Sequence, residues 1–162
     1  MAARGKKPTD WRKRFGAAKP PHVVMLHADF AGVKAGNTML ISSPGEIANY
    51  VARIPRGETR TMDRLRNEMA RKAGAGAMCP VTAAIYLRVV AEVALTDLAE
   101  GRPLDQVVPF WRVVTADSKL AKKLSCGPDH VAHLAALDAG QASGDQPDGG
   151  PALRQRRHGS HV

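Results

Sequence analysis

The run from Ala83 to Ala91 constrains the fold of this chain most, because nearly every one of its positions is apolar. Pro80 or Thr82 can begin a helix just before the run, and Gly101 can end one after it. A helix that is apolar on all sides is usually buried in a protein core. We therefore predict a long central helix between these signals, with the rest of the domain packed around it.

Two amphipathic helices are predicted before the central one. Ser43, Pro44 and Glu46 form a capping box for the first helix, and Thr61 provides the cap of the second, which Gly74 ends. Apolar residues then recur at helical spacing in both segments. They are Ile47, Tyr50, Val51 and Ile54 in the first helix, and Met62, Leu65, Met69 and Ala73 in the second.

The remaining segments are shorter. Asp117 or Ser118 caps a basic helix with the sequence KLAKKL, and a last helix begins at Asp129 and ends at Gly140. Short apolar runs at residues 22–26 and 38–41 are predicted strands, residues 74–78 a turn, and residues 107–114 a turn or extended segment. Five helices with two to four short strands indicate a mainly α (α+β) domain of compact helical or helix-turn-helix type.

The net charge of +9 is concentrated at the N-terminus. Residues 1–20 contain seven basic residues and one acidic residue, whereas residues 21–140 are nearly balanced. We predict a flexible basic arm at 1–21, a folded domain at 22–140 and a flexible Gly- and Pro-containing tail at 141–162. Basic arms bind nucleic acids and other polyanions without sequence preference, although they also serve as solubilising tails.

No apolar run approaches the roughly 18 residues that a membrane span needs, and the charged N-terminus lacks the apolar region of a secretory signal. We therefore expect a cytoplasmic protein without a membrane partner. Cys79 and Cys126 form no CxxC motif, so we expect reduced thiols, no structural zinc and no cofactor.

The stretch IPRGETRT at residues 54–61 is followed by a helix, a Gly-containing turn, the apolar helix and then PFWRVV at residues 109–114. This order resembles the C-terminal winged-helix domain of the alkylguanine-DNA alkyltransferases, whose motifs read IPxGxTxTYGEL and PCHRV. The resemblance covers about residues 54–140. It implies a winged-helix-like fold with a DNA-facing surface and a place in DNA repair, as in the alkyltransferase-like proteins that bind DNA without the reactive cysteine.

The resemblance does not extend to the family's chemistry. Phe110 stands where the family has its acceptor cysteine, and Trp111 stands where it has the activating histidine. Alkyl transfer needs a thiolate and a neighbouring base, and neither side chain supplies one. Met62 replaces the family's tyrosine, no arginine stands at Thr82–Ala84 where the family has its intercalating arginine, and about ten residues are inserted near Thr96–Gln106. We therefore expect a protein that is not an enzyme.

Basic side chains near the two motifs and in the arm are the candidate nucleic-acid contacts. Trp111 is a further candidate, because it can stack on a base, although a lone Trp beside Phe and Val is more often part of a core. The candidates are Arg56, Arg60, Arg64, Arg66, Arg71, Lys72, Trp111, Arg112, Lys119, Lys122 and Lys123 in the domain, and Arg12, Lys13 and Arg14 in the arm. The charges balanced by Glu58, Asp63 and Glu68 are equally typical of solvated helix faces.

These observations favour a non-enzymatic DNA-binding protein that recognises damaged or duplex DNA, with DNA preferred to RNA and a location at the nucleoid. The alternative is a ribonucleoprotein or protein-interaction accessory module whose basic tails dock on RNA or an acidic protein. A third hypothesis is an enzyme that uses Cys79 at a helix N-terminus, or a metal held by Cys126, His130 and His133, whose spacing allows three ligands to converge.

Overall fold

The computed structural model describes residues 7–144, with side-chain surroundings through residue 140. The described part contains six α-helices, two short 3-10 helices and one sheet. The helices are α1 (Trp11–Ala17), α2 (Pro44–Ala52), α3 (Met62–Lys72), α4 (Pro80–Ala99), η1 (Leu104–Gln106), η2 (Phe110–Arg112), α5 (Lys119–Lys123) and α6 (Gly127–Gly144), and the strands are β1 (His22–Met25), β2 (Thr38–Ile41) and β3 (Ala77–Met78). The predicted mainly α (α+β) class is confirmed.

The predicted helix caps form as hydrogen bonds. The Ser43 hydroxyl oxygen accepts from the Glu46 N–H at 3.2 Å, the Thr61 hydroxyl from the Arg64 N–H at 3.1 Å, and the Ser118 hydroxyl from an N–H at 3.1 Å. Each cap satisfies an N–H that has no partner inside its helix. Local sequence signals therefore set the starts of α2, α3 and α5.

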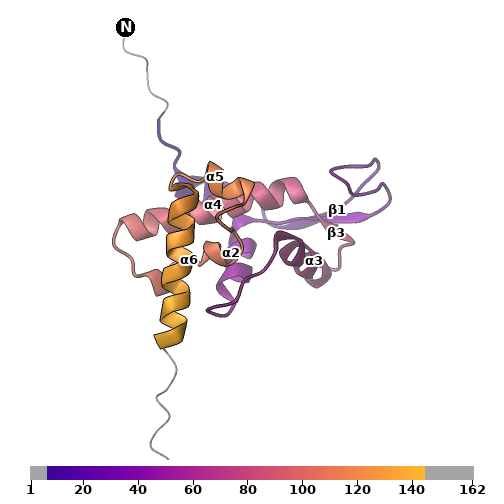
Figure 1. Ribbon diagram of the computed structural model, residues 1–162. Coiled ribbons are helices and arrows are strands. Elements are labelled where there is room, and N and C mark those ends of the chain that lie inside the picture. Colours follow the sequence, from indigo (N-terminus) through magenta and orange to yellow (C-terminus); the bar gives the residue numbers. More distant parts are fainter. Residues whose placement is uncertain (1–6, 145–162) are drawn as a thin grey trace, which may run out of the picture.

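Helix α4 lies at the centre of the domain (Figure 1) and packs against α1, α2 and η2. Leu87, Val90 and Ala91 are at most 2% exposed, as predicted for this helix. Its first turns differ from the prediction, because Val81 and Ile85 are 47% and 44% exposed. Helix α4 is therefore buried along its middle but open where it begins beside the sheet.

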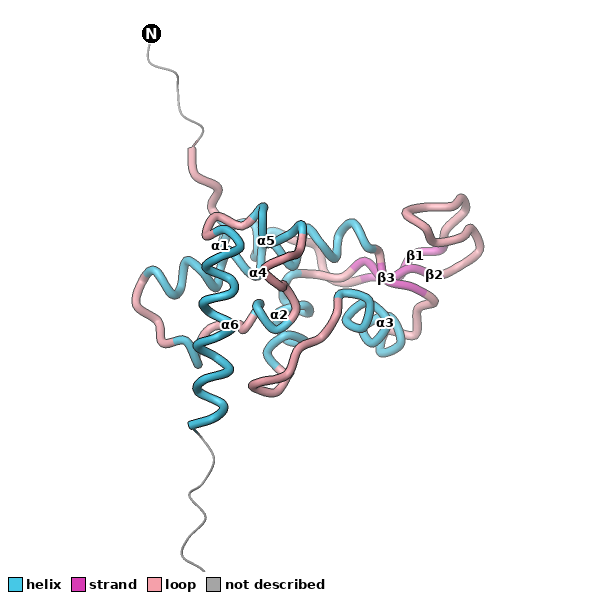
Figure 2. The backbone as a smooth tube through the Cα atoms, in the orientation of Figure 1, coloured by secondary structure: helices cyan, strands magenta, loops and turns pink. Residues whose placement is uncertain are grey.

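The sheet has the order β1-β2-β3, with β1 antiparallel to β2 and β2 parallel to β3. Val24 lies opposite Met39, and Leu40 lies opposite Met78. The strands predicted at 22–26 and 38–41 are confirmed, while the segment predicted as a turn at 74–78 contributes β3. Figure 2 shows the sheet at one side of the molecule, with the loop between β1 and β2 extending beyond α3.

The N-terminal segment corrects the predicted domain boundaries. Residues 11–17, predicted as part of a flexible arm, form α1, which Asp10 caps by accepting from the Lys13 N–H. Phe15 packs against the main core, so this part of the arm belongs to the folded unit. At the other end, α6 continues past Gly140 to Gly144. Residues 1–6 and 145–162, for which we predicted flexible ends, lie outside the described residues.

Candidate nucleic-acid interface

The PFWRVV segment is part of the core. Phe110 and Trp111 are 0% and 3% exposed, with ring centroids 5.2 Å apart in an edge-to-face arrangement. The Trp111 indole N–H donates to the Asp138 carboxylate at 2.9 Å. Trp111 therefore belongs to the core, the interpretation given above as the more usual one, and its ring is not open for stacking on a base.

Arg112 is also held inside the molecule. Its Nε and Nη2 donate to the two carboxylate oxygens of Asp138, each at 2.8 Å, and its Nη1 donates to the Ile54 carbonyl at 2.6 Å. These bonds hold the pKa of Asp138 below its usual value, first through Arg112 and then through Trp111. Arg112 joins α6, η2 and the end of α2, so it is not available as the predicted phosphate contact.

Arg12 is also paired, although its side chain remains 48% exposed. Its guanidinium donates to Glu100 at 2.6 and 3.0 Å and to Asp97 at 2.6 Å, which fastens α1 to the C-terminal half of α4. Next to it, the Trp11 ring has the guanidinium carbons of Arg14 and Arg88 each 5.2 Å from its centroid. Helix α1 was not predicted from the sequence, because a seven-residue helix with no buried residue shows almost no apolar periodicity.

A groove between α2 and α3 gathers basic side chains from three segments. It has a volume of about 510 Å³, and its apolar floor is formed by Ile54, Met69 and Ala73. Four cations and two carboxylates line it: Arg53 at the end of α2, Arg60 in the loop, Arg64 and Lys72 on α3, with Glu46 and Glu68. The cations therefore exceed the carboxylates by two.

The negative charge of the Glu68 carboxylate is compensated by hydrogen bonds within the groove. It accepts from the Tyr50 hydroxyl at 2.5 Å and from the Arg64 Nε at 2.7 Å. The Tyr50 hydrogen bond and then the Arg64 bond lower the pKa of Glu68, while burial and then the Glu68 contact raise the pKa of Tyr50 to about 12. The network thus keeps Tyr50 protonated and Glu68 ionised at neutral pH, and it fixes α2 against α3.

The four cations of the groove differ in whether their side chains make hydrogen bonds or ion pairs. Arg60 donates to Glu58 at 2.9 Å and to the Thr59 carbonyl at 3.0 Å. Within residues 7–140, the side chains of Arg53 and Lys72 make no such bond. Arg53 was absent from the sequence prediction, although it continues the polar stripe that Glu46 and Asn49 begin at helical spacing along α2.

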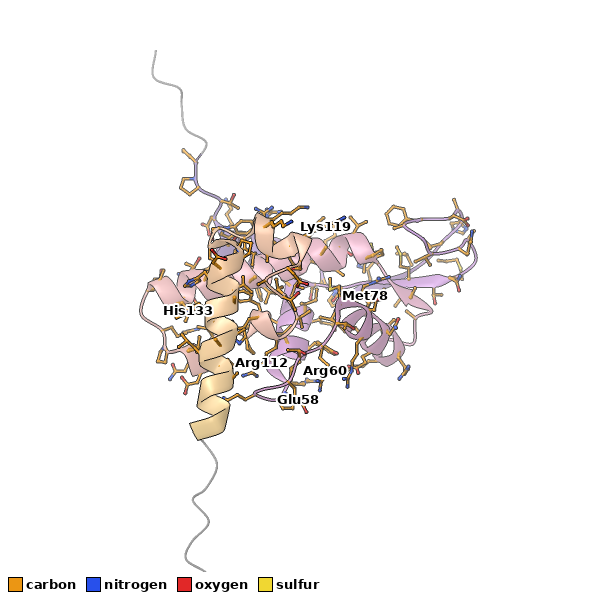
Figure 3. All side chains as sticks on the ribbon, viewed as in Figure 1. Glu58, Arg60, Met78, Arg112, Lys119 and His133 are labelled. Carbon is orange, nitrogen blue, oxygen red and sulfur yellow. The ribbon has the colours of Figure 1, made fainter. Side chains whose placement is uncertain are left out.

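The other predicted contacts do not share one surface with this groove. Arg56 Nε lies 4.0 Å from Asp138, and Arg66 pairs with Asp63 at 3.5 Å. In Figure 3, Lys119 lies at the upper side of the molecule and Arg60 near the lower side. Lys122 and Lys123 are exposed on α5 with Lys119. The predicted set is therefore spread over at least two faces.

The third hypothesis was an enzyme that uses the Cys79 thiol or a metal held by Cys126, His130 and His133, and the described residues support neither arrangement. Cys79 is 2% exposed. Burial, and then the charge of Glu92, raise the pKa of the Cys126 thiol, which disfavours a thiolate. The rings of His130 and His133 have centroids 6.0 Å apart, but no three His, Cys, Asp or Glu side chains in the described part of the chain are placed to hold a metal ion.

Comparisons with protein-family models, with curated proteins and with solved structures found no match for this chain. Between residues 7 and 144, no helix combines the length and the apolarity that crossing a membrane requires.

Proposed function

We propose that this chain is a non-enzymatic DNA-binding protein that holds the phosphate backbone of duplex DNA in the groove between α2 and α3. The observation that carries the proposal is the presence of Arg53 and Lys72 in this groove with side chains unpaired among the described residues, whereas Arg60 and Arg64 pair with Glu58 and Glu68. Arginine and lysine bind phosphates by charge-assisted hydrogen bonds and by release of counterions.

Duplex DNA is preferred as the ligand because it carries about one phosphate charge per 1.7 Å of its axis, which is a dense target for the unpaired cations of the groove. The exposed start of α4 carries Val81 and Ile85, which have no hydrogen-bonding groups for base edges. We therefore expect binding that depends on the backbone and is nearly independent of base sequence. With Phe110 and Trp111 buried, a lesion has no site at that position, and a damaged duplex should bind no tighter than an intact one.

The test is fluorescence anisotropy of a labelled duplex over a series of salt concentrations. Arg53→Glu/Lys72→Glu should weaken binding by about tenfold or more at low salt and reduce the slope of log K against log salt by about 2. Lys122→Glu/Lys123→Glu on α5 is the matched control, because it changes the net charge equally at another face. It should weaken binding much less.

Two results would contradict the proposal. One is equal weakening by the two double variants, which would mean that only net charge matters. The other is stronger binding of single-stranded RNA than of duplex DNA in direct competition, which would favour the ribonucleoprotein alternative. Circular dichroism of each variant checks that the helices are retained.

A further inference from the structure

Strand β1 has an open outer edge. It is the first strand in the order β1-β2-β3, and within residues 7–144 its only partner strand is β2. The Leu26 N–H donates to the Asn37 carbonyl at 3.0 Å, and alternate residues of an antiparallel ladder face the partner. Val24 therefore directs its N–H and C=O toward β2, while those of Val23 and Met25 point outward.

The side chains around this edge are exposed and apolar. Val23 and Met25 are 45% and 52% exposed, and Phe30, on the loop that follows β1, is 46% exposed. Edge strands of soluble proteins are usually protected by charged residues, by proline or by a covering segment. β1 has no Lys, Arg, Asp, Glu or Pro among its four residues, HVVM.

We propose that β1 of one molecule pairs antiparallel with β1 of a second copy, joining the two sheets into one of six strands. A two-fold axis perpendicular to the sheet, midway between the Val24 residues of the two copies, sets Val23 opposite Met25 of the second copy. In this register, the outward N–H and C=O groups of both residues all find partners. The two Val24 residues then face each other in a pair without hydrogen bonds.

Neighbouring registers leave groups unpaired. A shift of two residues in one direction sets Met25 opposite Pro21, which has no N–H, and the opposite shift sets Val23 opposite His27, beyond the end of the strand. The strand ends also favour the antiparallel arrangement, because Lys19 precedes β1 and Asp29, whose side chain is 62% exposed beside Lys34, follows it. Each basic end then lies toward the acidic end of the other copy.

The amount of apolar surface indicates a weak dimer. β1 is a strand of only four residues, and Val23 and Met25 are the half-exposed apolar side chains on it. A standard interface buries about 800 Å² on each partner. We therefore expect a monomer–dimer equilibrium that shifts with protein concentration. The proposal does not depend on DNA binding.

Sedimentation equilibrium of the full chain tests the dimer. The wild-type protein should show a mass that rises toward twice the monomer with concentration. Val23→Lys/Met25→Lys should raise the dissociation constant at least tenfold, because lysines of the two copies would stand opposite each other. Leu137→Lys is the matched control, since Leu137 is also 45% exposed but lies on α6, and it should leave the equilibrium unchanged.

A disulfide tests the register independently. In a Cys126→Ser background, Val24→Cys should form a cross-linked dimer on mild oxidation, because Cα atoms in a pair without hydrogen bonds are about 4.5 Å apart. Val23→Cys should cross-link more slowly, since Val23 faces Met25 of the other copy. The proposal is overturned by a monomer at every concentration, by a dimer that Val23→Lys/Met25→Lys leaves intact, by equal cross-linking of the two cysteine variants, or by a monomer that binds an extended peptide along β1 instead.

Discussion

Asp138→Ala should destabilise the whole domain, because the carboxylate of Asp138 joins α6 to the segment before α5. The variant removes two of the three acceptors of the Arg112 guanidinium, at 2.8 Å each, and the acceptor of the Trp111 indole N–H at 2.9 Å, while the Ile54 carbonyl remains. The side chains of Arg112 and Asp138 are only 12% and 7% exposed, so water has little access to replace the lost bonds.

The expected loss is about 3–5 kcal/mol, the usual result of removing one partner of a buried ion pair. Asp138→Asn keeps the volume of the side chain and one carbonyl oxygen but loses the charge, so it should cost less, about 2 kcal/mol. A domain of this size is stable by roughly 5–15 kcal/mol, so the alanine variant should shift the unfolding midpoint strongly.

Urea unfolding followed by tryptophan fluorescence measures both changes. Arg112→Met/Asp138→Leu should be more stable than Asp138→Ala, because no buried charge is left without a partner. A loss of less than about 1 kcal/mol in Asp138→Ala would refute the view that this cluster holds the domain together.

The same carboxylate gives a pH dependence. The pKa of Asp138 is lowered from 3.8 by the Arg112 hydrogen bonds, so its contribution is complete above the unfolded pKa. The contribution is lost as the pH falls through the lower folded pKa, since protonation is then easier in the unfolded chain. The wild-type protein should therefore lose stability below about pH 4, and Asp138→Asn should lose less over that range.

Three further predictions concern other contacts. Glu92 is 2% exposed and accepts from the Ser125 N–H at 2.7 Å and from its hydroxyl at 2.6 Å, so Glu92→Ala should lower the free energy of unfolding by about 2 kcal/mol in urea denaturation, and Glu92→Gln by less. In Tyr86→Phe, ultraviolet titration should show the remaining tyrosine, Tyr50, ionising near pH 12 rather than 10, and Glu68→Gln in that background should lower this value. Because the folded pKa of Tyr50 is raised, its contribution to stability is complete below pH 10 and lost toward pH 12. Arg12→Ala should speed amide hydrogen exchange in residues 11–17 while leaving exchange in α4 unchanged, since it weakens the attachment of α1 and leaves the packing of Phe15 in place.

Much of the local structure was predictable because its signals lie within a few residues of one another. Ser43, Thr61 and Ser118 cap their helices as expected. By contrast, α1 was missed, because its place is fixed by Asp97 and Glu100, more than eighty residues away. The candidate contacts were predicted from charge alone, which cannot distinguish a guanidinium paired inside the fold from one facing solvent.

The sequence by itself therefore determined the mainly helical class, the position of the central helix and most helix starts, since capping and apolar period act over one or two turns. Only the tertiary structure decided which basic residues remain available. It pairs Arg112 with Asp138 and Arg12 with Glu100, and it brings Arg53 and Lys72 to one groove. Ion pairs across the fold depend on how helices pack, and packing is a property of the whole chain rather than of any segment.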